Sequence, residues 1–430
     1  MSPGKMGTKP RPTPAPSLFR KVINVLGPGV ITGAADDDPS GVATYSIAGA
    51  QCGTSLLWLA LITWPLMAAV QMMCARIGMV TQEGLGSALL KKFPRWVVAG
   101  AALLLLDANT LNVGADLAAM ADAAQLVTGW DSRLFVLIFG AGIAWATVAF
   151  RYQQIASILK WLVLSLLAYV VTAFIVHPHW RLIARDAIVP TLDGDKERWT
   201  TIVAILGTTI SPYLFFWQAA QEVEETRAFS RRMKLAVSDP TRSQLLNRKI
   251  DVTIGAFFSN AVMFFIILTC AETLHRAGDT HISTTKEAVE ALRPLAGKGA
   301  ALLYTLGLVG VGILAIPTLT GSAAYALAET FRWPEGLNEK FKGAQAFYSV
   351  VLISTLCGVA LDFLGINPVL ALYWSAVVNG VLAPFLLCGI LLVAADRVVM
   401  KGSRSSPLSF ILVAFTALAM FGAAVGMFVI

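Results

Sequence analysis

Three consecutive carboxylates, Asp36, Asp37 and Asp38, lie inside an apolar stretch that runs from residue 22 to residue 50. Placing one charged side chain at the centre of a bilayer costs about 2.5 to 3.5 kcal/mol on insertion scales. Three charges at that depth therefore predict a polar cavity rather than contact with lipid. Carboxylates in such a cavity can bind a metal cation or carry a proton, so these residues are the first candidates for chemistry.

A proline and a glycine follow the aspartates and predict a broken helix. Pro39 lacks a backbone N–H and Gly41 adds flexibility, so we expect the break between residues 36 and 41. A second apolar stretch, 199 to 225, contains a similar run from Gly207 to Pro212. Helices that break at membrane depth line cavities, and their freed carbonyl groups become ligands. A simple proline kink is the alternative, but it would not require three neighbouring aspartates.

The elements that must hold these residues are membrane-spanning helices. Hydrophobic residues make up 56% of the 430 residues and charged residues 14%, and the mean hydropathy is +0.69. Soluble domains carry about 25% charged residues. A helix rises 1.5 Å per residue, so about 20 residues cross the hydrocarbon core. Eleven apolar runs are long enough: 22–50, 54–78, 96–127, 133–150, 156–177, 199–225, 250–273, 300–329, 345–363, 367–393 and 407–429.

The two predicted breaks fall in the first and sixth of these spans. Interrupted helices at corresponding places are typical of transporters built from two inverted five-helix repeats. The sequence thus predicts an all-α polytopic membrane protein in five parts. These are a disordered cytoplasmic N-terminus (1–20), a first five-helix repeat (21–177), an external loop (178–198), a second five-helix repeat (199–393), and a loop with an accessory eleventh helix (394–430).

The basic residues predict the orientation of the chain. Most of the 33 lysines and arginines fall in loops on the same side as the N-terminus if the spans alternate in direction. The positive-inside rule then places the N-terminus in the cytoplasm and the C-terminus outside, in a multi-pass protein of the plasma (inner) membrane. The net charge of +7 needs no nucleic-acid partner to explain it. The lipid bilayer is the expected environment; the oligomeric state stays open, and a monomer is compatible.

The two broken segments resemble those of the natural resistance-associated macrophage protein (Nramp) metal-ion transporters. That family carries a GP(G/A)…A..DPGN pattern in its first span and GATVMPHN in its sixth. The matching residues are Gly27, Pro28, Gly29, Ala35, Asp38 and Pro39 in the first span, and Gly207, Thr209 and Pro212 in the sixth. The resemblance implies the leucine-transporter-type fold, two inverted five-helix repeats plus an eleventh helix, and metal-ion transport rather than an enzymatic activity.

The resemblance also implies a set of metal ligands. Asp38 would supply a carboxylate, and Ala35 and Thr208 would supply backbone carbonyls. Gly41 stands where the family has an asparagine ligand, and Ser211 stands where it has a methionine ligand. The chain therefore departs from the family at two of the three side-chain ligands.

The ligands that remain are oxygens, which favour hard cations over soft transition metals. Mg²⁺ keeps several waters and is usually bound by one or two carboxylates, so small residues at Gly41 and Ser211 would suit its wider hydrated form. We expect an alternating-access transporter of divalent cations, Mg²⁺ or Mn²⁺ favoured, with the metal as substrate and no cofactor. A proton-coupled Mn²⁺/Fe²⁺ transporter, a trivalent-metal transporter and a sensor that no longer transports remain as alternatives.

Four further polar residues could extend this site. Asp36 and Asp37 are interpreted as extra ligands or a cation-attracting vestibule; the alternative is a solvated helix end or a carboxyl kept protonated by its neighbours. Gln218 lies two helical turns beyond Ser211 and is expected to face the same side. Asn379 lies in the tenth span. Either amide could bind a water of the cation, or make an interhelical hydrogen bond instead.

Asp116 and Asn109 in the third span lie where the resemblance places the family's proton route. The family has acidic residues there and at the position of Ala119, and only Asp116 is retained. A proton relay needs titratable groups within hydrogen-bond reach of one another, so the sequence predicts weak or absent proton coupling. Asp107 and Asp122 as shifted partners are the alternative.

Two other interpretations concern acidic residues. Glu222, Glu224 and Glu225 at the end of the sixth span predict a solvated helix end, with an exit vestibule as the alternative. An intramembrane aspartyl protease could use Asp38 and Asp116 as a dyad, but the Tyr-Asp and Gly-x-Gly-Asp signatures of such enzymes are absent from the sequence. We therefore expect no enzyme.

Overall fold

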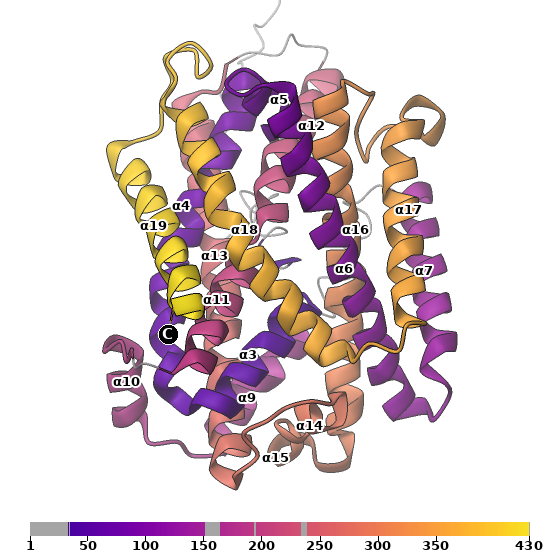
Figure 1. The fold of residues 1–430 in the computed structure, drawn as a ribbon, viewed down its shortest axis with the longest axis vertical. Coiled ribbons are helices and arrows are strands. Elements are labelled where there is room, and N and C mark those ends of the chain that lie inside the picture. Colours follow the sequence, from indigo (N-terminus) through magenta and orange to yellow (C-terminus); the bar gives the residue numbers. More distant parts are fainter. Residues whose placement is uncertain (1–32, 34, 151–163, 193–194, 234–238, 430) are drawn as a thin grey trace, which may run out of the picture.

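The computed structural model describes residues 33, 35–150, 164–192, 195–233 and 239–429, and every regular element in these ranges is helical. The long helices form one bundle, with short helices at its two ends (Figure 1). The helices are α3 (Pro39–Cys52), α4 (Leu57–Thr81), α5 (Leu85–Leu90), α6 (Arg95–Thr128), α7 (Ser132–Ala149), α9 (Leu167–Ile175), α10 (Trp180–Ile188), α11 (Lys196–Thr209), α12 (Pro212–Met233), α13 (Arg242–Cys270), α14 (Thr285–Glu290), α15 (Arg293–Ala296), α16 (Ala300–Phe331), α17 (Gln345–Asp362), α18 (Pro368–Ala395) and α19 (Pro407–Val429). Short helical turns adjoin them at Gly53–Leu56, Leu164–Leu166, Ala271–His275, Gly297–Gly299 and Phe341–Gly343.

Each of the eleven predicted spans contains at least part of a described helix. Nine helical stretches in the described part of the chain are long and apolar enough to cross a membrane. The count differs because Pro39–Thr81 is one continuous stretch covering parts of the first two spans, joined by the turn Gly53–Leu56. The fifth span is described only from residue 164 onward. The predicted disordered segment 1–20 lies outside the described residues.

Both helix breaks are confirmed where proline and glycine predicted them. The first interrupts the chain at Asp37 and Asp38, and α3 begins at Pro39. The second interrupts it at Ile210 and Ser211, between the end of α11 and the start of α12. The two halves meet in space, because α3 packs against α11 as well as against α13 and α18.

Small residues let the helices around the breaks approach backbone to backbone. A Cβ atom at Gly207 would lie 2.0 Å from the carbonyl oxygen of Ala376, so any side chain at this position would force α11 and α18 apart. A Cβ atom at Gly49 would lie 2.4 Å from the carbonyl oxygen of Ile267, which fixes α3 against α13 in the same way. Close packing through small residues is how helices associate without a hydrophobic driving force in lipid.

An ionic cluster joins α12 to α13, and we define it as Arg248, Glu222, Glu225 and Asp251. The Arg248 guanidinium lies 2.6 Å from the Glu222 carboxylate and 2.6 Å from that of Asp251, and it also pairs with Glu225. The Glu222 side chain is 2% exposed and that of Asp251 is 0% exposed. The expectation of a solvated helix end is therefore wrong for Glu222. It is equally wrong for Glu224, which is 8% exposed and accepts hydrogen bonds from the Leu337 N–H, Tyr325 and Asn338.

Candidate metal-binding site

Asp38 forms the N-cap of α3 at the first helix break. Its backbone is extended there, with φ −65° and ψ 171°, and its Oδ1 accepts a 2.7 Å hydrogen bond from the Gly41 N–H. Its Oδ2 accepts a 3.2 Å hydrogen bond from the side-chain amide of Asn112 on α6. A carboxylate offers about four lone-pair directions, so both oxygens can still accept a cation. The residue is only 2% exposed, which encloses this acceptor within the bundle.

Two prolines free two backbone carbonyls at the breaks. In an α-helix the carbonyl of residue i accepts from the N–H of residue i+4, and proline has no N–H. Pro39 follows Ala35 by four residues and Pro212 follows Thr208 by four residues, so both carbonyls lose their helical donor. The Ala35 carbonyl instead accepts a 3.0 Å hydrogen bond from the Tyr213 hydroxyl on α12. The carbonyls expected as ligands are thus the ones that helix geometry leaves available.

Gly41 and Ser211 occupy the positions where the family would supply two further side-chain ligands. The Ser211 hydroxyl donates a 2.6 Å hydrogen bond to the carbonyl of Gly207, and its oxygen keeps lone pairs with which it can accept. A Cβ atom at Gly41 would lie 3.2 Å from the Asp36 carbonyl oxygen and 3.3 Å from the Tyr45 ring. The room expected beside Gly41 is therefore filled by these neighbours in this conformation.

Asp36 and Asp37 are enclosed beside Asp38 rather than solvated. Their exposed fractions are 0% and 2%, so the interpretation as a solvated helix end is wrong. The Ser259 hydroxyl on α13 lies 2.6 Å from one oxygen of Asp36 and 3.1 Å from one of Asp37, and its single proton can be donated to only one of them at a time. Among the described residues no lysine or arginine forms an ion pair with any of these aspartates. Buried carboxylates without a cationic side chain need a proton or a bound cation as counter-charge.

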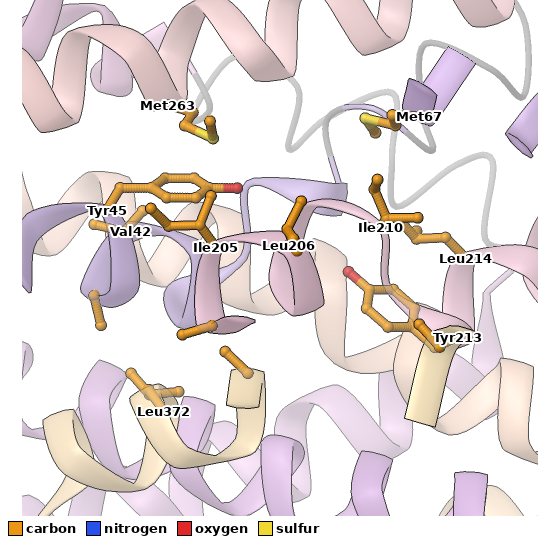
Figure 2. Close-up of a cluster of buried hydrophobic side chains, with 14 of the residues drawn as sticks. Val42, Tyr45, Met67, Ile205, Leu206, Ile210, Tyr213, Leu214, Met263 and Leu372 are labelled. Atoms are coloured by element: carbon orange, nitrogen blue, oxygen red, sulfur yellow. The ribbon is translucent and has the colours of Figure 1, made fainter. Parts of the chain in front are cut away.

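Two buried tyrosines connect the two helix breaks. The Tyr45 hydroxyl lies 3.1 Å from the Thr209 hydroxyl at the end of α11, and Tyr213 reaches the first break from the start of α12. Figure 2 shows Tyr45 beside Ile205 at one end of the segment that carries the second break, and Tyr213 beside Leu214 at the other. Each break is therefore tied by a hydroxyl to the opposite broken helix.

Two thioethers that the sequence did not single out are hydrogen-bonded inside the bundle, one of them to a residue at the second break. The sulfur of Met263 on α13 accepts a 3.6 Å hydrogen bond from the Thr209 hydroxyl. The sulfur of Met67 on α4 accepts a 3.5 Å hydrogen bond from the Asn260 amide. Both contacts engage the sulfur with a neighbouring polar group, and nothing in the spacing of these methionines along the chain marked them.

The remaining candidate residues are placed less uniformly. Gln218 donates a 2.7 Å hydrogen bond to Glu222 and so connects to the ionic cluster. Asn379 is 2% exposed, and its Oδ1 has no hydrogen-bond partner among the described residues. Asn109 donates to the Leu319 carbonyl and to the Ser322 hydroxyl, both at 2.9 Å. Gln218 and Asn379, the two amides expected to extend the metal site, are therefore both buried within the bundle.

Asp116, like Asp38, is a buried acidic residue. It is fully buried on α6, and neither carboxylate oxygen has a hydrogen-bond partner in the described part of the chain. Asp107 is exposed, and Asp122 lies six residues farther along α6, about 9 Å at the helical rise. Neither is a direct hydrogen-bonding neighbour of Asp116.

Sequence reasoning gave Asn112, Ser259 and Ser375 no role in the site. Asn112 donates to Asp38 and accepts a 2.5 Å hydrogen bond from the Ser375 hydroxyl on α18, so it links α3, α6 and α18. Its spacing of four residues from Asp116 places both on one helical face, which is a signal that could have identified it. Ser259 and Ser375 lie on apolar helices with no such pattern around them.

Two broken helices that cross at a buried carboxylate define a polytopic membrane protein of the leucine-transporter-type fold. The model of the "Natural resistance-associated macrophage protein-like" family matches residues 29–430. The chain therefore belongs to the Nramp family.

Two curated relatives agree with this assignment, and two solved structures share the fold. The chain is 26% identical over 403 residues to the divalent metal cation transporter MntH of Aeromonas hydrophila, covering 90% of this chain and 91% of the relative. It is 24% identical over 405 residues to MntH of Deinococcus radiodurans, covering 92% and 87%. A manganese transporter of Eremococcus coleocola, solved with an aromatic bis-isothiourea compound, has a TM-score of 0.72 at 16% identity, covering 97% and 96%. Mhp1, a nucleobase-cation-symport-1 family transporter, has a TM-score of 0.58 at 14% identity, covering 94% of this chain and 92% of the Mhp1 chain.

Proposed function

We propose that the chain transports hard divalent cations, Mg²⁺ or Mn²⁺, through a site between its two helix breaks. The observation that carries this proposal is the set of oxygens there: the Asp38 carboxylate, and the Ala35 and Thr208 carbonyls that two prolines free from helical bonding. Carboxylate and carbonyl oxygens suit Mg²⁺, Ca²⁺ and Mn²⁺. The relatives named above as divalent metal cation transporters support the class of substrate.

Transport through this site would proceed by alternating access. Asp38, Thr208 and Ser211 are at most 3% exposed, so a cation reaches them only when helices move apart. The two broken helices are the elements that would move, since each ends or begins at the site. Asp36 and Asp37 would raise the local negative charge, and Gln218 and Asn379 would act through waters. The N-terminus would be cytoplasmic and the C-terminus external, in the plasma (inner) membrane.

Cation preference separates this proposal from a soft-metal transporter. Replacing Ser211 by methionine should shift the preference from Mg²⁺ towards Cd²⁺, because a thioether is a soft ligand. We expect inhibition of Mn²⁺ uptake by Cd²⁺ to strengthen about tenfold or more in Ser211→Met proteoliposomes, with inhibition by Mg²⁺ weakened. The matched control is Ser211→Ala, which removes the hydroxyl without adding sulfur. Identical Mg²⁺ and Cd²⁺ inhibition curves for Ser211→Met and Ser211→Ala would contradict the role of this position. Gly41→Asn is a less clean probe, because its side chain would have to displace the Asp36 carbonyl.

We also propose that proton coupling is weak or absent. Asp116 has no titratable hydrogen-bond partner among the described residues, and Asn109 is bonded to a carbonyl and a hydroxyl. Cation uptake should therefore acidify the lumen of proteoliposomes by much less than one proton per cation, as read by an entrapped pH dye. An imposed inward proton gradient should leave the uptake rate unchanged within about twofold. Stoichiometric acidification that disappears in Asp116→Asn would instead favour a proton-coupled Mn²⁺ transporter.

A further inference from the structure

A cavity of about 580 Å³ opens between α4, α13 and the start of α19, and none of its lining residues belongs to either helix break. Figure 1 shows α19 at one side of the bundle, beside α4 and α18. The cavity lies at the end where α4 finishes and where α13 and α19 begin. The positive-inside rule predicts that this end faces the cytoplasm.

One part of the cavity wall is strongly basic. Arg76 from α4 and Arg242 and Lys249 from α13 all line it. None of the three forms an ion pair with an acidic residue in the described part of the chain. The hydrogen bond that Arg76 makes is to the backbone carbonyl of Arg404, which leaves its charge uncompensated. Three cations around one cavity predict an anionic occupant.

Hydroxyl and amide donors stand beside these cations. Ser405, Ser406 and Ser409 line the same cavity, and the buried Ser405 hydroxyl has no hydrogen-bond partner among the described residues. The Ser406 oxygen accepts a 3.2 Å hydrogen bond from the Ser409 N–H, so it caps the first turn of the 23-residue helix α19. Backbone donors at the start of such a helix favour phosphate.

The rest of the wall is apolar and opens towards the hydrocarbon of the membrane. Leu61, Leu246 and Leu408 line the cavity and are 47%, 58% and 63% exposed. Exposed leucines on the outside of a membrane helix contact acyl chains. Phosphate-binding groups and exposed leucines lining one cavity, with Leu61 farthest along α4 from Arg76, match a molecule that has an anionic head and an apolar tail.

We propose that this cavity binds an anionic phospholipid, with its phosphate among Arg76, Arg242 and Lys249 and an acyl chain along Leu61 and Leu246. Basic pockets between membrane helices at the cytoplasmic side are the general form of such sites. The N-terminal segment 1–32, which is outside the described residues, is a poor competing occupant. Residues 1–35 contain lysine and arginine but no acidic residue, so they cannot neutralise the three cations.

Native mass spectrometry of the purified full chain tests this proposal, with dioleoyl phosphatidylglycerol or dioleoyl phosphatidylcholine added to the detergent. The wild type should retain phosphatidylglycerol and release phosphatidylcholine. Each single variant, R76Q, R242Q or K249Q, should lower phosphatidylglycerol retention about fivefold. The triple variant R76Q/R242Q/K249Q should lower it by about fivefold for each of its three cations. The matched control K340Q/K342Q/R397Q removes three exposed cations from the same predicted side, and it should bind like the wild type.

A second variant keeps the charges and fills the space. Ala68 lines the cavity, so Ala68→Phe should lower phosphatidylglycerol retention even if the triple variant folds poorly. Deleting residues 2–20 should leave retention unchanged. Equal retention of the two lipids by the wild type, or full retention by both R76Q/R242Q/K249Q and Ala68→Phe, would overturn the proposal. A large gain on deleting residues 2–20 would also overturn it, because the N-terminal segment would then be the occupant.

Discussion

Asp38→Asn is expected to abolish cation uptake while leaving the protein folded. Asparagine keeps the size and planarity of the side chain and is as good a helix N-cap as aspartate, so α3 can still begin at Pro39. What is lost is the negative charge and one of the two strong acceptor oxygens. Even the outer partners of metal ligands cost about 10- to 100-fold in affinity, so we expect the loss of this ligand to lower uptake at least about 100-fold. Flux of Mn²⁺ into proteoliposomes containing a metal-sensitive dye measures the effect.

The matched control for this variant is Asp131→Asn. Asp131 is also a helix N-cap, accepting a hydrogen bond from the Arg133 N–H at the start of α7, but it is exposed and far from the breaks. Its uptake should equal that of the wild type. If Asp38→Asn takes up every divalent cation tested as fast as the wild type, the metal site does not lie at Asp38, whatever the behaviour of Asp131→Asn.

Arg248→Gln is expected to destabilise the folded protein strongly. It would leave Glu222 and Asp251 buried and without their cation, together with the partly exposed Glu225. Removing one partner of a buried ion pair typically costs about 3 to 5 kcal/mol, because the remaining charge is uncompensated. We expect the free energy of unfolding in detergent to fall by an amount in that range. Thermal or denaturant unfolding of the purified protein provides the measurement.

Two comparisons make this prediction specific to the ionic cluster. Arg231→Gln removes an arginine that pairs with Glu339 at the surface, where both side chains are exposed, and it should cost about 0 to 1 kcal/mol. Adding Glu222→Gln to Arg248→Gln should recover part of the loss, since one stranded charge is then removed. An Arg248→Gln protein as stable as Arg231→Gln would show that the buried carboxylates do not depend on the guanidinium.

The features that the sequence could predict are those fixed by local chemistry. Hydropathy located the spans, since about 20 apolar residues are needed to cross the hydrocarbon core, and each predicted run contains a described helix. Proline located the breaks, because Pro39 and Pro212 cannot donate the helical hydrogen bond at their positions. Asp38 could be identified because its spacing from Pro39 matched a family pattern.

The features that could not be predicted depend on which distant side chains meet. The spacing of Gln218 from Ser211 gave no sign of its 2.7 Å hydrogen bond to Glu222, which connects it to the ionic cluster. Glu222 looked like a solvated helix end because its partner Arg248 lies 26 residues away on another helix. Ser259 bridges two aspartates more than 220 residues before it, and no local pattern announces such a contact.

The carbonyls of Ala35 and Thr208 have a consequence for how this protein would appear in a genetic screen. Every amino acid has the same backbone carbonyl, so changing either side chain leaves the candidate ligand itself in place. An alanine scan would therefore report Asp38 and remain silent at the two carbonyl ligands. The informative positions for those two ligands lie four residues downstream, at Pro39 and Pro212, where any other residue would bring back an N–H to compete with the cation.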